Sequence, residues 1–320
     1  MQVAPGLTVT SDPSVTGRLR IGHNTLNNAS SPLHVVRHTR MLEQLYPNVE
    51  VEWRDIFTST QTRDTLLARE IDMTYSTTPV FVQGWSRGVP YKILTPLSRF
   101  DGWLMVRPDG PADITGFVGS GMKISPGPGT TPYYAAKALL SRAGADIDAL
   151  EQSWVVLEPA QSAQLLATGS PQELGGQWDT DRWSVLNRDA GMRRIASFSD
   201  AFGMPVATVA ITLTDWAETN PALATAVAGA LRTAITWMRD NPGPAAEQLA
   251  AFTRAAGNDD AEPAHYVELF EAGLLEPITA DAGIAELERL FQGLDLVEGD
   301  GTPAGPADYY TFPEHAGTRW

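Results

Sequence analysis

The chain has 320 residues, enough for two lobes that each bury a core of their own. Its hydrophobic content of 43% and charged content of 19% are those of an ordinary globular protein. The formal net charge of −15 argues against nucleic acid or an anionic membrane surface as the main partner. There is no cysteine, which excludes disulfides, thiolate catalysis and cysteine metal sites.

Residues 1–17 are rich in Pro, Ser and Thr and show little apolar periodicity, so we interpret them as a leader or linker. They contain neither a basic n-region nor an apolar h-region, and we expect no signal peptide within them. No apolar run in the chain approaches the length of a membrane span.

One pattern occurs three times: a short strand, a polar loop, and a hydroxyl residue followed by proline that begins a helix. The strands are predicted at 19–22, 71–75 and 122–125, and the helices begin at Ser31-Pro32, Thr78-Pro79 and Thr131-Pro132. In an open parallel sheet, the loops at the carboxyl ends of strands line the ligand crevice. We therefore expect the three loops to share one cleft. The alternative is that such pairs simply begin helices, as Asn220-Pro221 does.

The third of these stretches, Met122–Gly144, is the most informative. Gly127 and Gly129 allow the loop to turn tightly and to expose its amides, and Thr131 is a good N-cap. A helix start of this kind favours an anion or a polar ligand oxygen. The stretch is not a nucleotide P-loop, because GxxxxGK[ST] is absent. We expect the loop to bind through backbone amides.

The remaining elements alternate between strands and helices, which places the fold in the α/β class. Strands are predicted at 49–53, 91–97, 103–106, 154–157, 194–198 and 206–213, and helices at 60–68, 160–168, 221–240, 244–256, 263–272 and 281–291. Residues 98–102 are predicted as a polar loop, and residues 241–244 as a helix break. The Gly- and Pro-rich tail 299–320 is predicted to pack as an irregular aromatic strap.

Three stretches carry a resemblance to a known family. They are LLAREIDMTYSTTPVFVQGWSRGVPYKILTPLSRFDGWLMVRPDG (66–110), MKISPGPGTTPYYAAKALLSRAG (122–144) and the neighbourhood of Gln177–Asp179. Over residues 19–238 the chain resembles extracytoplasmic solute-binding proteins of the nitrate/sulfonate/taurine type, a group that includes the binding proteins for thiamine-pyrimidine precursors. It departs from the family pattern at 38–42 and at 119–123.

The resemblance implies a two-lobe, type II periplasmic-binding-protein-like clam with a hinge of two crossing strands. Lobe one would comprise 18–106 and 207–320, and lobe two 107–206. The implied function is capture of a small organic ligand, anionic or aromatic/heterocyclic, for import by an ABC transporter permease. The protein would be a monomer outside the cytoplasm, either periplasmic or anchored to the membrane as a lipoprotein, with its signal peptide removed and with no cofactor and no metal. A cytoplasmic location is the alternative.

The same scaffold also carries enzymes, so a second hypothesis is a cytosolic decarboxylase- or lyase-like enzyme that uses His23 as acid or base. The sequence is similar to sulfinate desulfinases over the first loop, but those enzymes need a cysteine there, and Asn24 lies about where it would be. That chemistry is excluded. No Ser/His/Asp or paired-carboxylate motif stands out, and we assign no catalytic residue. His34 and His38 have metal-ligand spacing on a helix, which we interpret as a surface pair.

The candidate ligand-binding residues come from the loops that should meet at the cleft. They are His23, Asn24, Thr25, Asn28, Ser76, Thr77, Thr78, Arg99, Phe100, Asp101, Gly127, Gly129, Thr130, Thr131, Tyr133, Gln177, Trp178 and Asp179. Arg99 is either an anion clamp of the cleft or the partner of Asp101. Trp178 either stacks on a flat ligand or belongs to the core.

Overall fold

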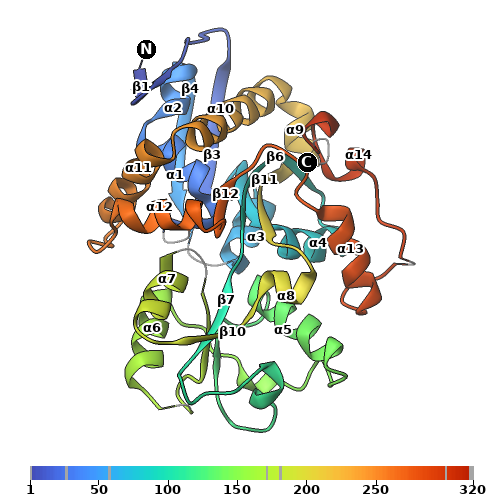
Figure 1. Ribbon diagram of the computed structural model, residues 1–320. Helices are drawn as coiled ribbons and strands as arrows, with labels where there is room; N and C mark the ends of the chain where they lie inside the picture. The colour runs from blue at the N-terminus through green and yellow to red at the C-terminus, as the bar shows by residue number, and fades with distance from the viewer. Residues whose placement is uncertain are drawn as a thin grey trace.

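The computed structural model describes residues 2–25, 28–56, 59–170, 172–179, 182–299 and 301–316. The chain forms two lobes, each built on its own sheet, with lobe one in the upper part of Figure 1. The sheet of lobe one consists of β3 (Thr16–His23), β4 (Asn48–Asp55), β5 (Met73–Thr77), β6 (Tyr91–Phe100), β11 (Val206–Leu213) and β12 (Leu275–Pro277). Its strand order is β12-β6-β11-β5-β3-β4.

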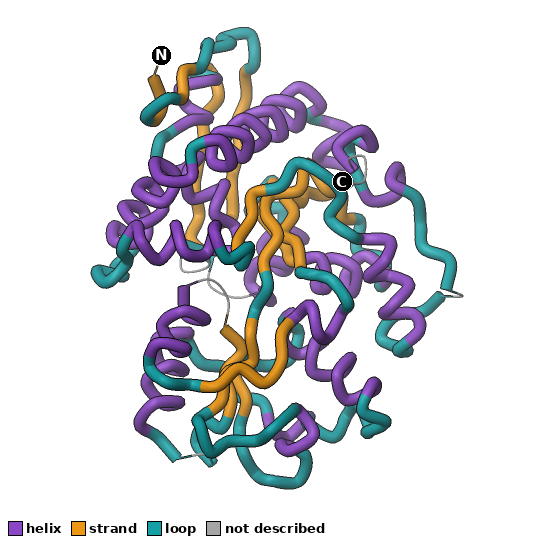
Figure 2. Tube along the Cα trace, in the orientation of Figure 1, coloured by secondary structure: helices purple, strands orange, loops and turns teal. Residues whose placement is uncertain are grey.

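The sheet of lobe two is smaller and comes from one uninterrupted part of the chain. It consists of β7 (Trp103–Val106), β8 (Ile124–Ser125), β9 (Gly176–Asp179) and β10 (Arg193–Ser197), in the order β10-β7-β9-β8. Helices α5 (Thr131–Arg142), α6 (Pro159–Thr168), α7 (Arg182–Asp189) and α8 (Phe198–Phe202) surround it, and both sheets are covered by helices in Figure 2.

The helices of lobe one come from both halves of the chain. They are α1 (Ser31–His38), α2 (Met41–Leu45), α3 (Ser59–Leu67), α4 (Thr78–Ser86), α9 (Thr214–Thr219), α10 (Pro221–Asp240), α11 (Pro242–Ala255), α12 (Pro263–Glu271), α13 (Ile284–Gly293) and α14 (Pro306–Tyr309). The longest, α10, has the predicted bounds. Its apolar positions recur at helical spacing, as in Leu223, Val227 and Leu231, and all three side chains are buried.

Strand direction brings the predicted loops together. β3 runs parallel to β4 and β5, with Ile21 opposite both Trp53 and Met73. Parallel strands end at the same edge of a sheet, so the segments after β3 and β5 begin side by side. The buried Asp72 just before β5 fixes this pairing, because its carboxylate accepts hydrogen bonds from the backbone N–H and the guanidinium of Arg20.

The chain crosses between the lobes twice. It leaves lobe one through Asp101 and Gly102, between β6 and β7, and returns through α8 into β11. The Asp101 carboxylate accepts a hydrogen bond from the Ser199 N–H (2.9 Å), which ties the two crossings together. A Cβ at Gly102 would lie 2.4 Å from the Phe198 ring, so only glycine fits there. The two predicted crossings between the lobes are present; the first runs from strand to strand, and the second includes the short helix α8.

Two expectations about lobe one need correction. Residues 2–8 are not a free leader: β1 (Gln2–Ala4) and β2 (Leu7–Thr8) form a hairpin, and the Trp237 indole N–H donates to the Pro5 carbonyl (3.0 Å). Residues 98–100 are not a loop, because β11 and β12 pair with β6 as far as Phe100 and hold this segment as strand. The predicted division, with 18–106 and 207–320 as lobe one and 107–206 as lobe two, stays an interpretation. It places β7 in lobe one, whereas β7 pairs with β9 in the sheet of lobe two.

Smaller differences have local causes. Residues 154–157 form only a single bridge, Trp154 to Ile124, rather than a strand. α11 begins at Pro242, because proline is accepted in the first turn of a helix, so the break is confined to Asn241. The tail is more regular than predicted: α14 precedes a bridge from Tyr310 to Ile93. Trp320 lies outside the described residues.

Candidate functional site

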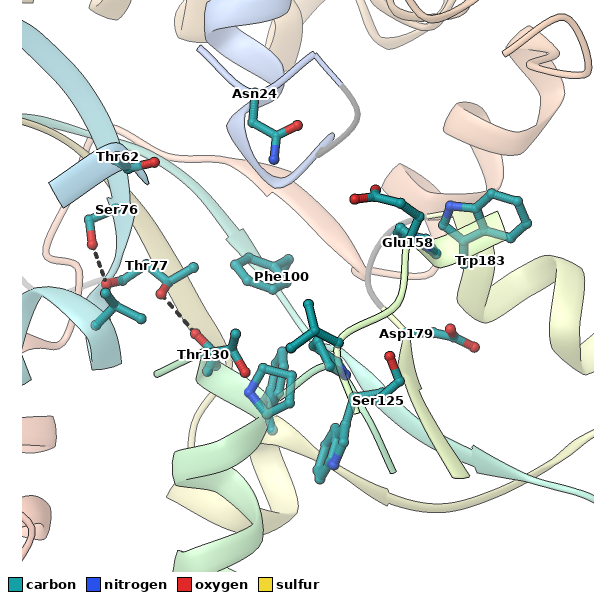
Figure 3. Close-up of a pocket in the computed structure, with 18 of the residues that line it drawn as sticks. Asn24, Thr62, Ser76, Thr77, Phe100, Ser125, Thr130, Glu158, Asp179 and Trp183 are labelled. Carbon is teal, nitrogen blue, oxygen red and sulfur yellow. Dashed lines mark hydrogen bonds between the residues drawn. The ribbon is translucent and has the colours of Figure 1, made fainter. Parts of the chain in front are cut away.

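A cavity of about 260 Å³ lies between the lobes, where the ends of β3, β5, β8 and β9 meet (Figure 3). Nine of the predicted residues line it: Asn24, Ser76, Thr77, Phe100, Thr130, Thr131, Gln177, Trp178 and Asp179. They come from all three strand–loop–helix stretches and from the facing segment at β9. The expectation that these loops share one cleft is therefore met by the geometry. Contact with a ligand stays a prediction for each residue.

The other predicted residues do not line the cavity: His23, Thr25, Thr78, Arg99, Asp101, Gly127, Gly129 and Tyr133. Arg99 lies within β6 and its ion-pair partner is Glu276 of β12, at 3.7 Å. The Asp101 carboxylate accepts the hydrogen bond from the Ser199 N–H that ties the two crossings together. The side chain of Asn28 lies outside the described residues.

The floor of the cavity is aromatic. The rings of Trp178 and Phe198 stack with centroids 5.2 Å apart and an interplanar angle of 9°. Phe100 meets Phe198 edge to face, at 5.7 Å and 83°. All three side chains are buried, so the floor is fixed before any ligand binds. Trp178 is therefore part of the core and also lines the cavity. Its stacking on a flat ligand stays a prediction.

The wall from lobe two is a buried polar cluster. Ser162 of α6 donates to the Ser125 hydroxyl (3.0 Å), and Asn187 of α7 donates to Asp179 (2.6 Å). Gln177 donates to the Pro159 carbonyl (3.3 Å). Each polar side chain is held by a neighbour, which gives the wall a defined pattern of donors and acceptors.

Two threonines from different lobes close one edge of the cavity. The Thr131 hydroxyl of α5 donates to the Thr77 hydroxyl at the end of β5, at 2.7 Å (Figure 3 shows this edge). The N-cap of α5 is Thr130 and not Thr131, because Thr130 has the extended backbone of an N-cap and Thr131 is already helical. The Thr130 hydroxyl donates to the Gly127 carbonyl (2.7 Å) and braces the loop.

Sequence reasoning missed several lining residues. Among them are Thr62, Tyr75, Tyr91, Ser162 and Phe198. One signal was available for Ser162: Glu158-Pro159 begins α6 with a proline in the first turn, as in the other cleft helices. Tyr91 and Phe198 lie on elements distant in sequence, and no local pattern indicates where their side chains point.

A buried histidine pair lies behind the first loop, which corrects the surface assignment of His34. His23 and His34 have no exposed surface, and His23 Nε2 lies 2.8 Å from His34 Nδ1. Arg37 Nη1 is 3.4 Å from His23 Nδ1 and can only donate. His23 therefore carries its proton on Nε2 and donates it to His34. His38 is exposed, and no group of three or more metal-ligating side chains occurs in the described part of the chain.

Both buried histidines are neutral. Burial lowers the pKa of His34 to about 3, with a smaller contribution from the charge of Arg37. Burial, with His34 and Arg37 nearby, lowers the pKa of His23 well below its usual value. Neutral rings can share one hydrogen bond without charge repulsion, so the pair packs against Phe252 as part of the core.

Ion pairs connect the lobes beside the cavity. Arg182 of α7 contacts Asp260 (2.9 Å) and donates to the Asn258 side chain (3.0 Å), both in the connection between α11 and α12. Arg188 of α7 contacts Glu268 of α12 at 2.8 Å. In Figure 1, α7 lies directly below α12. The lobes are therefore in contact in this structure.

Taken together, two lobes, two chain crossings and a cavity at the strand ends between them define a two-lobe clam architecture. No protein-family model matches the chain, and no curated protein matches it in sequence. Among solved structures it is similar to the alkanesulfonate-binding protein SsuA from Xanthomonas axonopodis pv. citri bound to MOPS, with a TM-score of 0.68 and 19% identity over 93% of this chain and 99% of that one.

Two further structures agree. The periplasmic aliphatic sulphonate-binding protein SsuA from Escherichia coli has a TM-score of 0.65 and 16% identity over 88% of each chain. The periplasmic nitrate-binding protein NrtA from Synechocystis PCC 6803 has a TM-score of 0.57 and 17% identity over 73% of this chain and 66% of that one. The chain thus has the fold of these periplasmic binding proteins, and the predicted fold class is confirmed.

Proposed function

We propose that this protein is the solute-binding component of an ABC-type importer, which captures a small organic molecule between its lobes. The observation that carries the proposal is the cavity at the strand ends, built from both lobes around two chain crossings. Such a geometry suits hinge closure, in which ligand contacts to both halves stabilise the closed form. The solved structures with the same fold include sulfonate- and nitrate-binding proteins, which supports this function.

The partners follow from the same proposal. A small solute would fill the cavity, and the closed, monomeric protein would deliver it, outside the cytoplasm, to the permease of the importer. None of the helices in the described residues is long and apolar enough to cross a membrane. The enzyme hypothesis is weaker, because His23, its only suggested acid or base, is fully buried and does not line the cavity.

A thermal-shift screen tests the proposal. Small sulfonates, carboxylates, pyrimidines and aromatic acids are screened for an increase in melting temperature, and each hit is then followed by small-angle X-ray scattering and mass spectrometry. We expect a bound solute to reduce the radius of gyration and to be recovered unchanged. Conversion of the solute would instead support the enzyme, and the absence of closure with every hit would refute the importer function.

A further inference from the structure

The described lining of the cavity holds little positive charge that could compensate an anionic ligand. The described lining residues at 24, 75–77, 125–132, 156–159 and 177–179 include no Lys or Arg. Among the described lining residues, Arg63 is the one cation. Its side chain is 52% exposed and is paired with Asp64 at 2.9 Å. Among the described lining residues, a bound anion would therefore meet no buried cation.

Negative groups lie on the opposite side of the cavity. In Figure 3, Glu158 lies next to Trp183 and Asp179 lies below them, and both carboxylates are on the side of the view opposite Thr62 and Thr77. Asp179 is buried and accepts a hydrogen bond from Asn187. An anion placed here would lose its hydration close to carboxylates, which disfavours its charged form.

The central loop offers few amides for an anion. Three of its seven residues from 126 to 132 are proline and have no N–H. The Tyr133 N–H, in the first turn of α5, donates to the Thr130 carbonyl at 3.1 Å. The dipole of α5 remains, but a partial charge of this kind does not replace a cation. The sequence-based expectation that this loop binds an anion through a set of amides has little support in this geometry.

Aromatic and apolar surfaces instead dominate the walls. The stacked floor of Phe100, Trp178 and Phe198 is joined by Tyr75 and Tyr91 from lobe one. Val156 lines the cavity and is 76% exposed, so a ligand that covers it removes apolar surface from water. Hydroxyl and amide side chains supply neutral hydrogen-bond partners around these surfaces.

We propose that the cavity takes an aromatic or heteroaromatic solute without negative charge and that it discriminates against anions of the same shape. The proposal rests on the solute-binding function and narrows its ligand class. The ring of the solute packs against the aromatic floor and Val156, while its polar substituents bond to side chains such as Gln177 and Thr77. Nitrate and short alkanesulfonates, which carry a full negative charge and little apolar surface, are not its ligands.

The test uses ligands that differ only in charge. Benzamide, benzamidinium, benzoate and benzenesulfonate, and the corresponding pyridine compounds, are titrated into the wild-type protein by calorimetry. We expect a neutral or cationic member to bind at least tenfold more tightly than the carboxylate and the sulfonate on the same ring. Equal or tighter binding of either anion overturns the proposal, and loss of that binding in Arg63→Gln would identify the missed anchor.

A charge-gain variant tests the reason for the selectivity. Val156→Arg places a cation at the cavity without removing a core side chain, and Val118→Arg makes the same change at an exposed site that does not line the cavity. We expect Val156→Arg to bind benzoate at least tenfold more tightly than Val118→Arg does. If the two variants bind benzoate alike, missing positive charge is not what excludes anions, and the proposal fails.

The same measurements separate this proposal from the broader function. Closure of the lobes around an anionic or aliphatic solute would refute the ligand class but leave solute capture intact. If no compound in the panel or the wider screen binds, both proposals fall.

Discussion

Removing the ion pair between α7 and the α11–α12 connection should open the protein and weaken ligand binding. Arg182 and Asp260 belong to different lobes, so their contact at 2.9 Å exists only while the lobes are together. The variant Asp260→Asn changes a residue outside the cavity and leaves the lining untouched. It therefore tests closure without altering the ligand contacts.

The magnitude follows from the burial of the two side chains. Arg182 is 2% exposed, whereas Asp260 is 64% exposed, so solvent screens one end of the pair. A charge-assisted hydrogen bond contributes about 1.5–3 kcal/mol and an exposed ion pair about 0.2–1 kcal/mol. We expect about 1–2 kcal/mol here, between these two cases. This corresponds to a dissociation constant raised roughly 5- to 30-fold.

The assay combines calorimetry on a solute found by the screen with the radius of gyration of the ligand-free protein. Asp259→Asn is the matched control, because it removes the same negative charge from the neighbouring residue. The Asp259 carboxylate has no ion pair among the described residues. Arg182→Gln and the double variant complete a thermodynamic cycle. Equal affinities for Asp260→Asn and Asp259→Asn would refute a role of this pair in closure.

Three further predictions concern stability and the central loop. Between pH 7 and 5 the free energy of unfolding should fall by up to about 1.4 kcal/mol per pH unit for each buried histidine. The unfolded chain takes up protons below about pH 6.5, whereas burial lowers the pKa of His34 to about 3 and the pKa of His23 well below its usual value. In urea unfolding, His34→Gln should flatten this slope. Gly129 has φ +80°, so Gly129→Val should cost about 1–2 kcal/mol in thermal melts, whereas Thr130→Val should cost about 0.5–1.5 kcal/mol. Normal ligand affinity in the folded Gly129→Val variant would support recognition through side chains, and a large loss of affinity would support recognition through the amides of this loop. Asp72→Ala should cost about 2–3 kcal/mol in chemical denaturation, because it leaves a partly buried arginine without its partner, and a loss below 1 kcal/mol would contradict this.

The pattern of strand, polar loop and hydroxyl–proline helix start was enough to predict which loops meet. The pattern predicts this because a helix between two strands lets the second strand run parallel to the first. The parallel pairing of β3 with β5 then places the segments after His23 and Thr77 at the same edge of the sheet. The facing position of Gln177 came from the family resemblance, since nothing in its local sequence indicates the partner across a cleft.

What the sequence could not predict depends on contacts between distant residues. His34 lies four residues before His38, a spacing that looks like one exposed face, yet Phe252 from α11 covers His34 and buries it. Arg99 was expected in a loop because its neighbours are polar, but pairing with β11 and β12 extends β6 through it. In both cases the deciding partner lies more than 100 residues away in the chain.

The position of β11 has a consequence for how the protein reaches its native state. β11 lies between β5 and β6 and pairs with both, so the two halves of the larger sheet are joined only after residue 213 has been synthesised. Lobe two, which is complete before that point, is free to fold first, while both edges of β6 stay unpaired because β11 and β12 come later in the chain. Such a delay leaves the nascent chain open to wrong strand pairing, and it keeps the larger lobe unfolded for as long as the ribosome or a chaperone holds its second half.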